Sequence, residues 1–110
     1  MYRNQRLRSP DGGHELIFQS DGNLVLYQTP KGSGAQVRWA SGTDRKDVFS
    51  LELQADGNLV LYSTGRWRNA PWASNSVDNS SVGKIRTVEV RNDGGLFLVQ
   101  EGKIVKDLRS

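Results

Sequence analysis

A nine-residue pattern that recurs along the chain constrains the fold more than any other feature. Its first two copies, at 19–27 and 54–62, begin 35 residues apart and are identical at eight of nine positions. A third copy, at 91–99, begins 37 residues after the second. Self-similarity at this spacing indicates a repeat architecture. Three copies in 110 residues leave little of the chain outside the repeat.

Each copy has the sequence of a β-hairpin. Asp-Gly between two alternating apolar runs favours a primed two-residue turn, in which both residues take positive φ. Side chains alternate between the two faces of a strand, so the leucines are predicted to face the core while Asn, Val and Tyr face outward. The predicted inward residues are Phe18, Leu24 and Leu26 in copy one, Leu51, Leu53, Leu59 and Leu61 in copy two, and Val88, Val90, Leu96 and Leu98 in copy three.

The third copy separates the needs of folding from other needs. It keeps the apolar inward positions and the Asp-Gly turn, but its outward positions change to Arg91, Gly95, Phe97 and Val99. The Gln and Tyr of the other copies have no turn role, which predicts a task on the outward face. The Asp and Asn are also explained as turn residues. A row of amide, carboxylate and phenol groups beside an aliphatic Val suits a polyol, since it offers hydrogen bonds and an apolar contact.

The pattern Gln-x-Asp-x-Asn-x-Val-x-Tyr, complete at 19–27 and at 54–62, resembles the mannose-binding motif of bulb-type, snowdrop-like monocot lectins. The Trp-Ala-Ser blocks at 39–41 and 72–74 also resemble that family's repeat. The resemblance covers essentially the whole chain. It implies an all-β fold, β-prism II, with three four-stranded antiparallel sheets around a pseudo-threefold axis. The expected organisation is a single lectin domain at 1–110, with repeats at roughly 14–47, 48–83 and 84–110.

The same resemblance implies which residues bind mannose, without a metal or other cofactor. Asp21 and Asn23 would hold the O2 hydroxyl. Gln19 would hold O3 and Tyr27 would hold O4, with Val25 packed on the ring carbons. In the second copy the same roles fall to Asp56, Asn58, Gln54, Tyr62 and Val60. Because an axial O2 distinguishes mannose from glucose, the Asp/Asn pair would carry specificity.

The aromatic residues outside the motifs have a structural interpretation. Trp39 and Trp72 are predicted to occupy matching repeat positions, with Leu108 as their match in repeat three. They are predicted to fill the axis of the prism rather than to stack on a ligand. Trp67 has no repeat partner, and a loop anchor, a glycan contact and an interface residue are all open for it. His14, the only histidine, is predicted to lie in a turn or at the start of a strand.

Composition argues against several other classes of protein. The net charge of +3 is mild, and no basic stripe with stacking aromatics indicates nucleic-acid binding. No apolar run approaches the roughly 20 residues that cross a bilayer, so no membrane insertion is expected. The absence of cysteine and the single histidine leave no thiol chemistry and nearly exclude zinc. No catalytic constellation is visible, and Asp21 and Asp56 belong to separate repeats, so no enzyme is predicted.

Partners and location follow from the same features. The resembled family commonly exchanges its C-terminal strand between subunits, so a homodimer is expected, with such exchange as one route. Plant bulb lectins usually carry a disulfide, whereas this chain has no cysteine and no secretion signal, which favours the cytoplasm over secretion. The alternative function is a lectin-like scaffold that binds protein, as in bacteriocin, inhibitor or taste-active relatives with decayed sugar sites. Two intact motifs argue against such decay.

Overall fold

The computed structural model describes most of the chain as β-structure. The described residues are 2, 4–28, 34–44, 48–54, 57–63, 72–74 and 86–109, with Phe49 described by its backbone alone. Within them lie ten strands and no helix, and therefore no helix that could cross a membrane. The predicted site residue Asp56 and the unmatched Trp67 lie outside the described residues.

The strands form three antiparallel sheets. Sheet one has the order β1 (Arg6–Arg8), β2 (His14–Phe18), β3 (Leu24–Gln28) and β4 (Gln36–Ala40). Sheet two has the order β5 (Val48–Leu53), β6 (Leu59–Ser63) and β7 (Trp72–Ala73). Sheet three has the order β10 (Lys103–Asp107), β9 (Leu96–Gln100) and β8 (Arg86–Val90). Sheet one thus has the four strands that were predicted, and the described residues supply three to each of the others.

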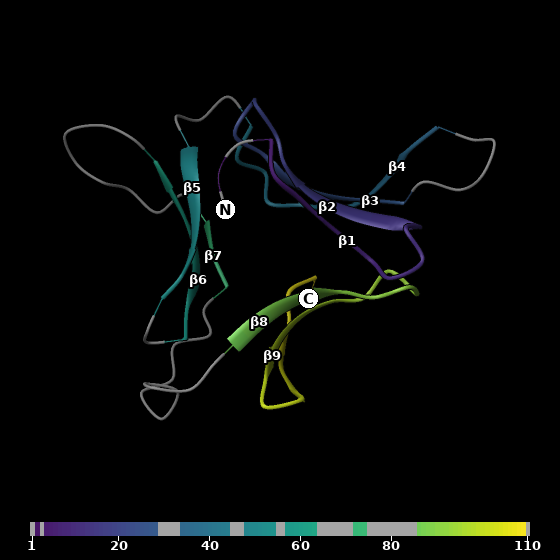
Figure 1. Cartoon of the computed structure of the whole chain (residues 1–110). Helices are drawn as coiled ribbons and strands as arrows, with labels where there is room; N and C mark the ends of the chain where they lie inside the picture. The colour runs from purple at the N-terminus through teal and green to yellow at the C-terminus, as the bar shows by residue number, and fades with distance from the viewer. Residues whose placement is uncertain are drawn as a thin grey trace.

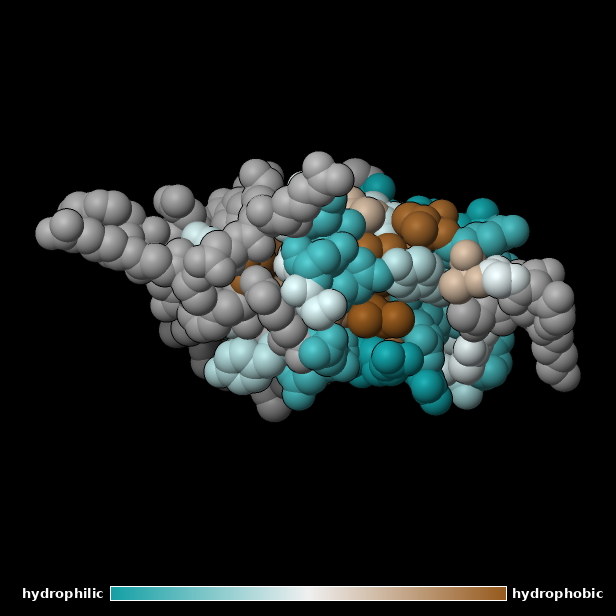
Figure 2. Space-filling model, turned by 90° about the horizontal axis from the view of Figure 1, so that it is seen from above, coloured by the Kyte–Doolittle hydropathy of each residue, from teal (hydrophilic) through white to brown (hydrophobic). Residues whose placement is uncertain are grey.

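The sheets are arranged as the sides of a triangular prism around a common centre (Figure 1). The predicted all-β prism with pseudo-threefold symmetry is confirmed. The molecule measures 44 × 35 × 21 Å, and Figure 2 shows it edge-on, with apolar atoms in small areas among polar ones. Near its start the chain crosses between two sides of the prism: Tyr2 forms a bridge to Ser50 of β5, whereas the residues of β1 pair with β2.

The inward leucines form one core at the centre of the prism. Leu26, Leu61 and Leu98, one from each sheet, are 0% exposed and belong to the same cluster of buried side chains. Burying a leucine side chain contributes about 1.5–3 kcal/mol relative to leaving it in water. The repeated leucines therefore hold the three sheets together, as the alternation predicted.

One predicted inward residue is exposed. Leu53, at the end of β5, is 37% exposed, whereas Phe18, its counterpart in β2, is fully buried. The N-terminal segment accounts for the difference, because Asn4 and Gln5 form backbone hydrogen bonds with Phe18 at 2.6 and 3.0 Å. Along β5 the described N-terminal residues supply only the bridge at Ser50. Leu53 therefore keeps the predicted face, which it shares with Leu51 and with its partner Leu59, but it is not buried.

The hairpin turns also differ from the predicted primed type. In the first turn the Gln19 carbonyl accepts the Gly22 N–H at 3.0 Å, and the Gln19 N–H donates to the Asn23 carbonyl at 2.8 Å. Gly22, Gly57 and Gly94 have φ near +89°, but Asp21 does not lie in the left-handed region. This is a three-residue loop in which a type I turn is followed by a left-handed glycine. The Asp-Gly pair forms a hairpin as predicted, but only the glycine needs positive φ.

Trp39 and Trp72 pack against the core. Their rings meet edge to face, with centroids 5.5 Å apart and planes at 72°. Both side chains are partly buried and contact the central cluster of leucines. Edge-to-face contacts of this kind add about 0.5–1.5 kcal/mol beyond burial. The prediction that these tryptophans pack inside the prism is confirmed.

The strand register corrects the predicted match for Leu108. Opposite the central leucine of the preceding strand, sheets one and two have the two tryptophans, and sheet three has Lys106. A β-bulge in β10 precedes this position. Leu108 instead donates its backbone N–H to the first residue of β9, as Ser41 and Ser74 do to the first residues of β3 and β6. Leu108 therefore takes the place of a serine, although its side chain is buried in the core.

Candidate functional site

The Gln and Tyr of each intact motif contact one another. The Gln19 side-chain amide donates a hydrogen bond to the Tyr27 hydroxyl. Gln54 and Tyr62 make the same contact in the second copy. The Gln and Tyr side chains of each copy therefore lie on the same face of their sheet, as the alternation predicted. Each pair places an amide and a phenol together as hydrogen-bonding groups on the surface of its sheet.

The valine of each motif is more buried than the alternation alone suggests. Val25 is 2% exposed and Val60 is 3% exposed. Val25 is flanked across the strands by Ile17 and Ala40. Gln19 lies at the turn end of the hairpin and Tyr27 lies further along β3, two residues after Val25. The valine methyl groups are therefore almost closed to solvent while the strand neighbours stay in place.

The motif Asn is held in place by a serine that the sequence analysis did not assign a role. Asn23 Oδ1 accepts hydrogen bonds from the Ser41 hydroxyl at 3.0 Å and from the N–H groups of Gly42 and Thr43 at 3.1 and 3.3 Å. The Ser41 hydroxyl also accepts the Leu24 N–H at 3.1 Å. These contacts use the carbonyl oxygen of the Asn23 amide and not its NH₂ group.

The second copy repeats this arrangement. The Ser74 hydroxyl donates to Asn58 Oδ1 at 3.1 Å and accepts the Leu59 N–H at 3.0 Å. Copy three, which has Gly95 in place of this Asn, indicated that the Asn is dispensable for folding. The structure corrects this, because the Asn carbonyl oxygen ties the hairpin to the serine after the last strand of its sheet. The recurring Trp-Ala-Ser block is the sequence feature that could have predicted this contact, because its serine makes the contact at Ser41 and at Ser74.

The motif Asp has a turn function in the described copies. Asp21 Oδ1 accepts the Asn23 N–H at 2.9 Å. In copy three, Asp93 Oδ1 accepts the Gly95 N–H at the same distance. This is the side-chain-to-backbone bond that Asp commonly makes in turns. Turn chemistry therefore accounts for this bond whether or not the rest of the motif is present.

The third copy fills its groove with its own side chains. The Arg91 guanidinium lies over the Phe97 ring, 4.8 Å from the centroid, and pairs with Glu89 at 3.2 Å. A Cβ atom on Gly95 would come within 2.4 Å of the Phe97 ring. The Phe97 ring thus occupies the space beside the position where the intact motifs have Asn. Relative to the intact motifs, Phe97 in place of Val therefore requires Gly95 in place of Asn, because a larger residue at 95 would collide with the ring.

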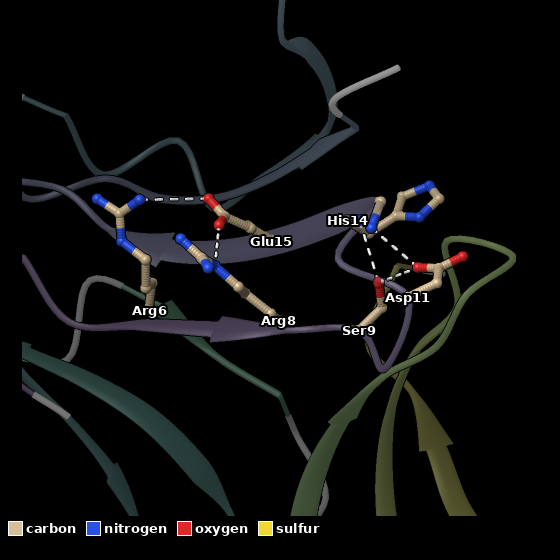
Figure 3. A network of polar contacts seen from close by, with 7 residues as sticks. Arg6, Arg8, Ser9, Asp11, His14 and Glu15 are labelled. Atoms are coloured by element: carbon tan, nitrogen blue, oxygen red, sulfur yellow. Dashed lines mark hydrogen bonds and ion pairs between the residues drawn. The ribbon is translucent and has the colours of Figure 1, made fainter. Parts of the chain in front are cut away.

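The rims of the two intact grooves differ. In sheet one, Glu15 lies opposite Tyr27 and pairs with Arg6 and Arg8 from the neighbouring strand (Figure 3). In sheet two, the residue opposite Tyr62 is Ser50. Two arginines thus contact one carboxylate beside Tyr27.

A polar turn follows β1 beside this rim. The Gly13 N–H and the Ser9 hydroxyl both donate to Asp11 Oδ1 at 2.8 Å (Figure 3). These hydrogen bonds, the Gly13 one first, hold the pKa of the exposed Asp11 carboxyl below its usual value. The Asp11 N–H donates in turn to Asn92 Oδ1 at 2.9 Å, which links this turn to the hairpin turn of copy three.

Two cavities of the described residues are lined by parts of the chain other than the intact motifs. A cavity of about 540 Å³ between β1 and β8 has Arg91 on its wall, and a second of about 390 Å³ includes Asp93. Neither is lined by a residue of the motif at 19–27 or at 54–62. Among the described residues, no group of three or more acidic or histidine side chains is placed to hold a metal ion.

The prism of three hairpin sheets, with side-chain pairs repeated on two of its faces, defines the fold of a β-prism lectin. The sequence matches no protein-family model and no curated protein. Solved structures of this fold do match. Monomeric monocot mannose-binding lectins from Gastrodia elata are 29% identical over 96% of this chain and 86% of theirs, with a TM-score of 0.73.

Two further structures extend the similarity beyond one source. The mannose-specific agglutinin of snowdrop, Galanthus nivalis, solved with methyl-α-D-mannoside, is 28% identical over 90% of this chain and 86% of its own, with a TM-score of 0.63. A domain-swapped lectin dimer from Mycobacterium smegmatis is 30% identical over 94% of this chain and 87% of its own, with a TM-score of 0.53. The structural neighbours of this chain therefore include bulb-type lectins and both monomeric and dimeric assemblies.

Proposed function

We propose that this protein is a bulb-type lectin that binds mannose or mannose-containing glycans at the grooves of 19–27 and 54–62. The observation that carries the proposal is the Gln–Tyr contact, which is the same in both intact copies and absent from the third. The lectin structures that share the fold support it. Binding needs no metal or other cofactor, and the protein is not an enzyme.

Each side chain has a role that its surroundings allow. The Gln19 amide and the Tyr27 hydroxyl exchange their mutual hydrogen bond for bonds to O3 and O4 of the sugar. The Asn23 NH₂ group, oriented by Ser41, donates to the axial O2 with the help of Asp21. Parting Gln19 from Tyr27 gives the sugar ring access to Val25. The equivalent residues of the second copy, including Asp56, take the same roles.

Affinity for a glycan arises from several weak contacts. Each hydroxyl exchanges water for protein at a net gain of about 1 kcal/mol per hydrogen bond, so one groove binds weakly. Two grooves per chain raise the effective affinity for a branched glycan, and a homodimer would double their number. β10 pairs with β9 of its own chain, so exchange of this strand between subunits would reproduce an existing pairing.

A calorimetric titration with methyl α-mannoside tests the proposal, with methyl α-galactoside as the control. We expect heat with the mannoside alone and about two sites per chain. The variant Gln19→Ala should remove one of the two sites while the chain stays folded. Absence of heat with both sugars at millimolar concentration would contradict the proposal and favour the protein-binding scaffold.

A further inference from the structure

A polar cavity lies where sheet one meets the hairpin turn of copy three. Its volume is about 390 Å³, and no residue of the two proposed sugar grooves lines it. Its walls come from β2, β3, β4, the third turn and the end of the chain. The lining residues are His14, Gln28, Arg38, Asn92, Asp93, Gly94 and Arg109.

The two arginines of this cavity bond only to neutral acceptors. Arg38 donates twice to Gln28 Oε1, through Nε at 2.6 Å and through a terminal nitrogen. Arg109 donates to the Gly94 carbonyl at 2.9 Å and to the Arg38 carbonyl at 3.3 Å. By contrast, the guanidinium groups of Arg6 and Arg8 both form ion pairs with the Glu15 carboxylate (Figure 3). Within the described part of the chain, the charges of Arg38 and Arg109 are therefore not met by an ion pair.

A buried imidazole without a partner lies in the same wall. His14 is 7% exposed, and its Nδ1 atom has no hydrogen-bond partner among the described residues. Figure 3 shows the His14 backbone N–H donating to the Ser9 hydroxyl oxygen, and no dashed line at the ring. A buried polar atom without a partner costs about 1–3 kcal/mol. The His14 side chain lines the cavity, although its Nδ1 atom is closed to solvent.

The acidic groups nearby leave the cavity positive. Asp93 is the one carboxylate among the lining residues, and its Oδ1 atom is used by the Gly95 N–H. Asp107 accepts the backbone N–H of Arg109 and does not line the cavity. Two guanidinium groups against one carboxylate give a net charge of +1 with His14 neutral.

A neutral side chain can make the bond that Arg109 makes to the third turn. The carbonyl of each hairpin glycine accepts a side-chain hydrogen bond: from Thr43 to Gly22 at 2.7 Å, from Arg86 to Gly57 at 2.9 Å and from Arg109 to Gly94 at 2.9 Å. The neutral hydroxyl of Thr43 shows that this bond does not itself need a charge. Arg38 contributes no such bond to a turn, because among the described residues its guanidinium donors reach Gln28.

We propose that this cavity binds a small oxyanion, the phosphate or carboxylate group of an acidic glycan. Both arginines are exposed, so an anion can reach their planar guanidinium groups, which match its oxygen pairs and form charge-assisted hydrogen bonds. The glycan source rests on the proposed lectin function, whereas the anion site itself does not. The site lies apart from the grooves, so an acidic branch and a mannose are bound at different places.

Nuclear magnetic resonance titrations with inorganic phosphate, mannose 6-phosphate and methyl α-mannoside test the proposal. Phosphate and mannose 6-phosphate should shift the His14 ring and the Gly94 amide, and methyl α-mannoside should not. Arg38→Gln should weaken the phosphate effect by about tenfold, since it removes a charged donor. Arg8→Gln is the matched control, because that exposed arginine is already paired with Glu15.

The outcomes are distinct. A tighter response to mannose 6-phosphate than to phosphate supports the glycan source, and equal responses support a site for free phosphate. Shifts with phosphate but no binding of mannoside anywhere would refute the lectin proposal and leave the anion site standing. No shift at His14 and Gly94 with either anion at millimolar concentration would overturn the anion site. An equal loss in Arg38→Gln and Arg8→Gln would also overturn it, as general charge attraction.

Discussion

The groove at 19–27 and the groove at 91–99 share a backbone and differ in side chains. The glycine of each turn has φ +89°, and the Asp of each turn accepts an N–H at 2.9 Å. In the first groove, Gln19 and Tyr27 contact one another and the motif valine is buried. In the other, Arg91 covers Phe97. A hairpin of the same backbone geometry can thus present hydrogen-bonding side chains, or pack its own side chains against one another on that face.

The comparison shows which positions belong to the fold. The turn and the inward leucines are common to all three copies, so the fold by itself accounts for them. The serine after the last strand belongs with the motif, since Ser41 and Ser74 both contact the motif Asn. In copy three, Gly95 replaces the Asn and Leu108 replaces the serine. The loss of a groove therefore involves a residue far away in the sequence.

The largest effect is expected from the shared core. Leu26→Ala and Leu98→Ala should each lower the free energy of unfolding by about 2–5 kcal/mol, because both side chains are 0% exposed. Urea denaturation measures the loss. Similar losses in the two variants would confirm that both copies depend on the same core, and an unchanged midpoint in either would show that its side chain does not face the core.

A coupled pair in the third groove comes next. Gly95→Asn should cost about 1–3 kcal/mol, because a Cβ atom there lies 2.4 Å from the Phe97 ring. Phe97→Val in the same chain should restore part of that loss. A double-mutant cycle for the free energy of unfolding gives the coupling. Strictly additive losses would mean that the two positions changed independently.

A smaller effect is expected at Ser41. Ser41→Ala removes hydrogen bonds to the Leu24 N–H and to Asn23 Oδ1, and should cost about 1 kcal/mol of stability. It should also weaken mannoside binding at the first groove, because the Asn23 amide is no longer oriented. Ser20→Ala is the control, since copy two has Ala55 at this position. Equal behaviour of the two variants in calorimetry would argue against an orienting role for Ser41.

The smallest change in stability is expected at Tyr27. Tyr27→Phe removes one hydroxyl from a half-buried ring and should alter the free energy of unfolding by at most about 0.5 kcal/mol. Mannoside binding at the first groove should still weaken. Tyr2→Phe, at a ring that is 64% exposed, serves as the control. Unfolding of Tyr27→Phe at room temperature would show that the hydroxyl supports the fold.

The sequence predicted the features that repeat. Period, alternation and Asp-Gly turns specify three hairpins with leucines inside, and the prism follows from the resemblance carried by two intact motifs. The predicted type of turn was wrong, because Asp-Gly suits both a primed turn and a type I turn with a following glycine. The exposure of Leu53 depends on where the N-terminal segment pairs, and no local pattern encodes that.

Features that join distant segments were also beyond the sequence. The bond between Asn23 and Ser41 depends on the register of β4 against β3, and the place of Leu108 depends on a bulge in β10. The cavity at Arg38 and Arg109 brings together residues 71 positions apart. Such contacts are set by the packing of the sheets, so no spacing rule within one strand reveals them.

The most direct test of the central claim is a map of backbone amide shifts during titration with methyl α-mannoside. The two intact grooves are proposed to bind and the third is not. The amides of Asn23 and Asn58 should shift and saturate, while that of Gly95 stays in place. A shift at Gly95 equal to that at Asn23, or no shift at any of the three, would contradict the account.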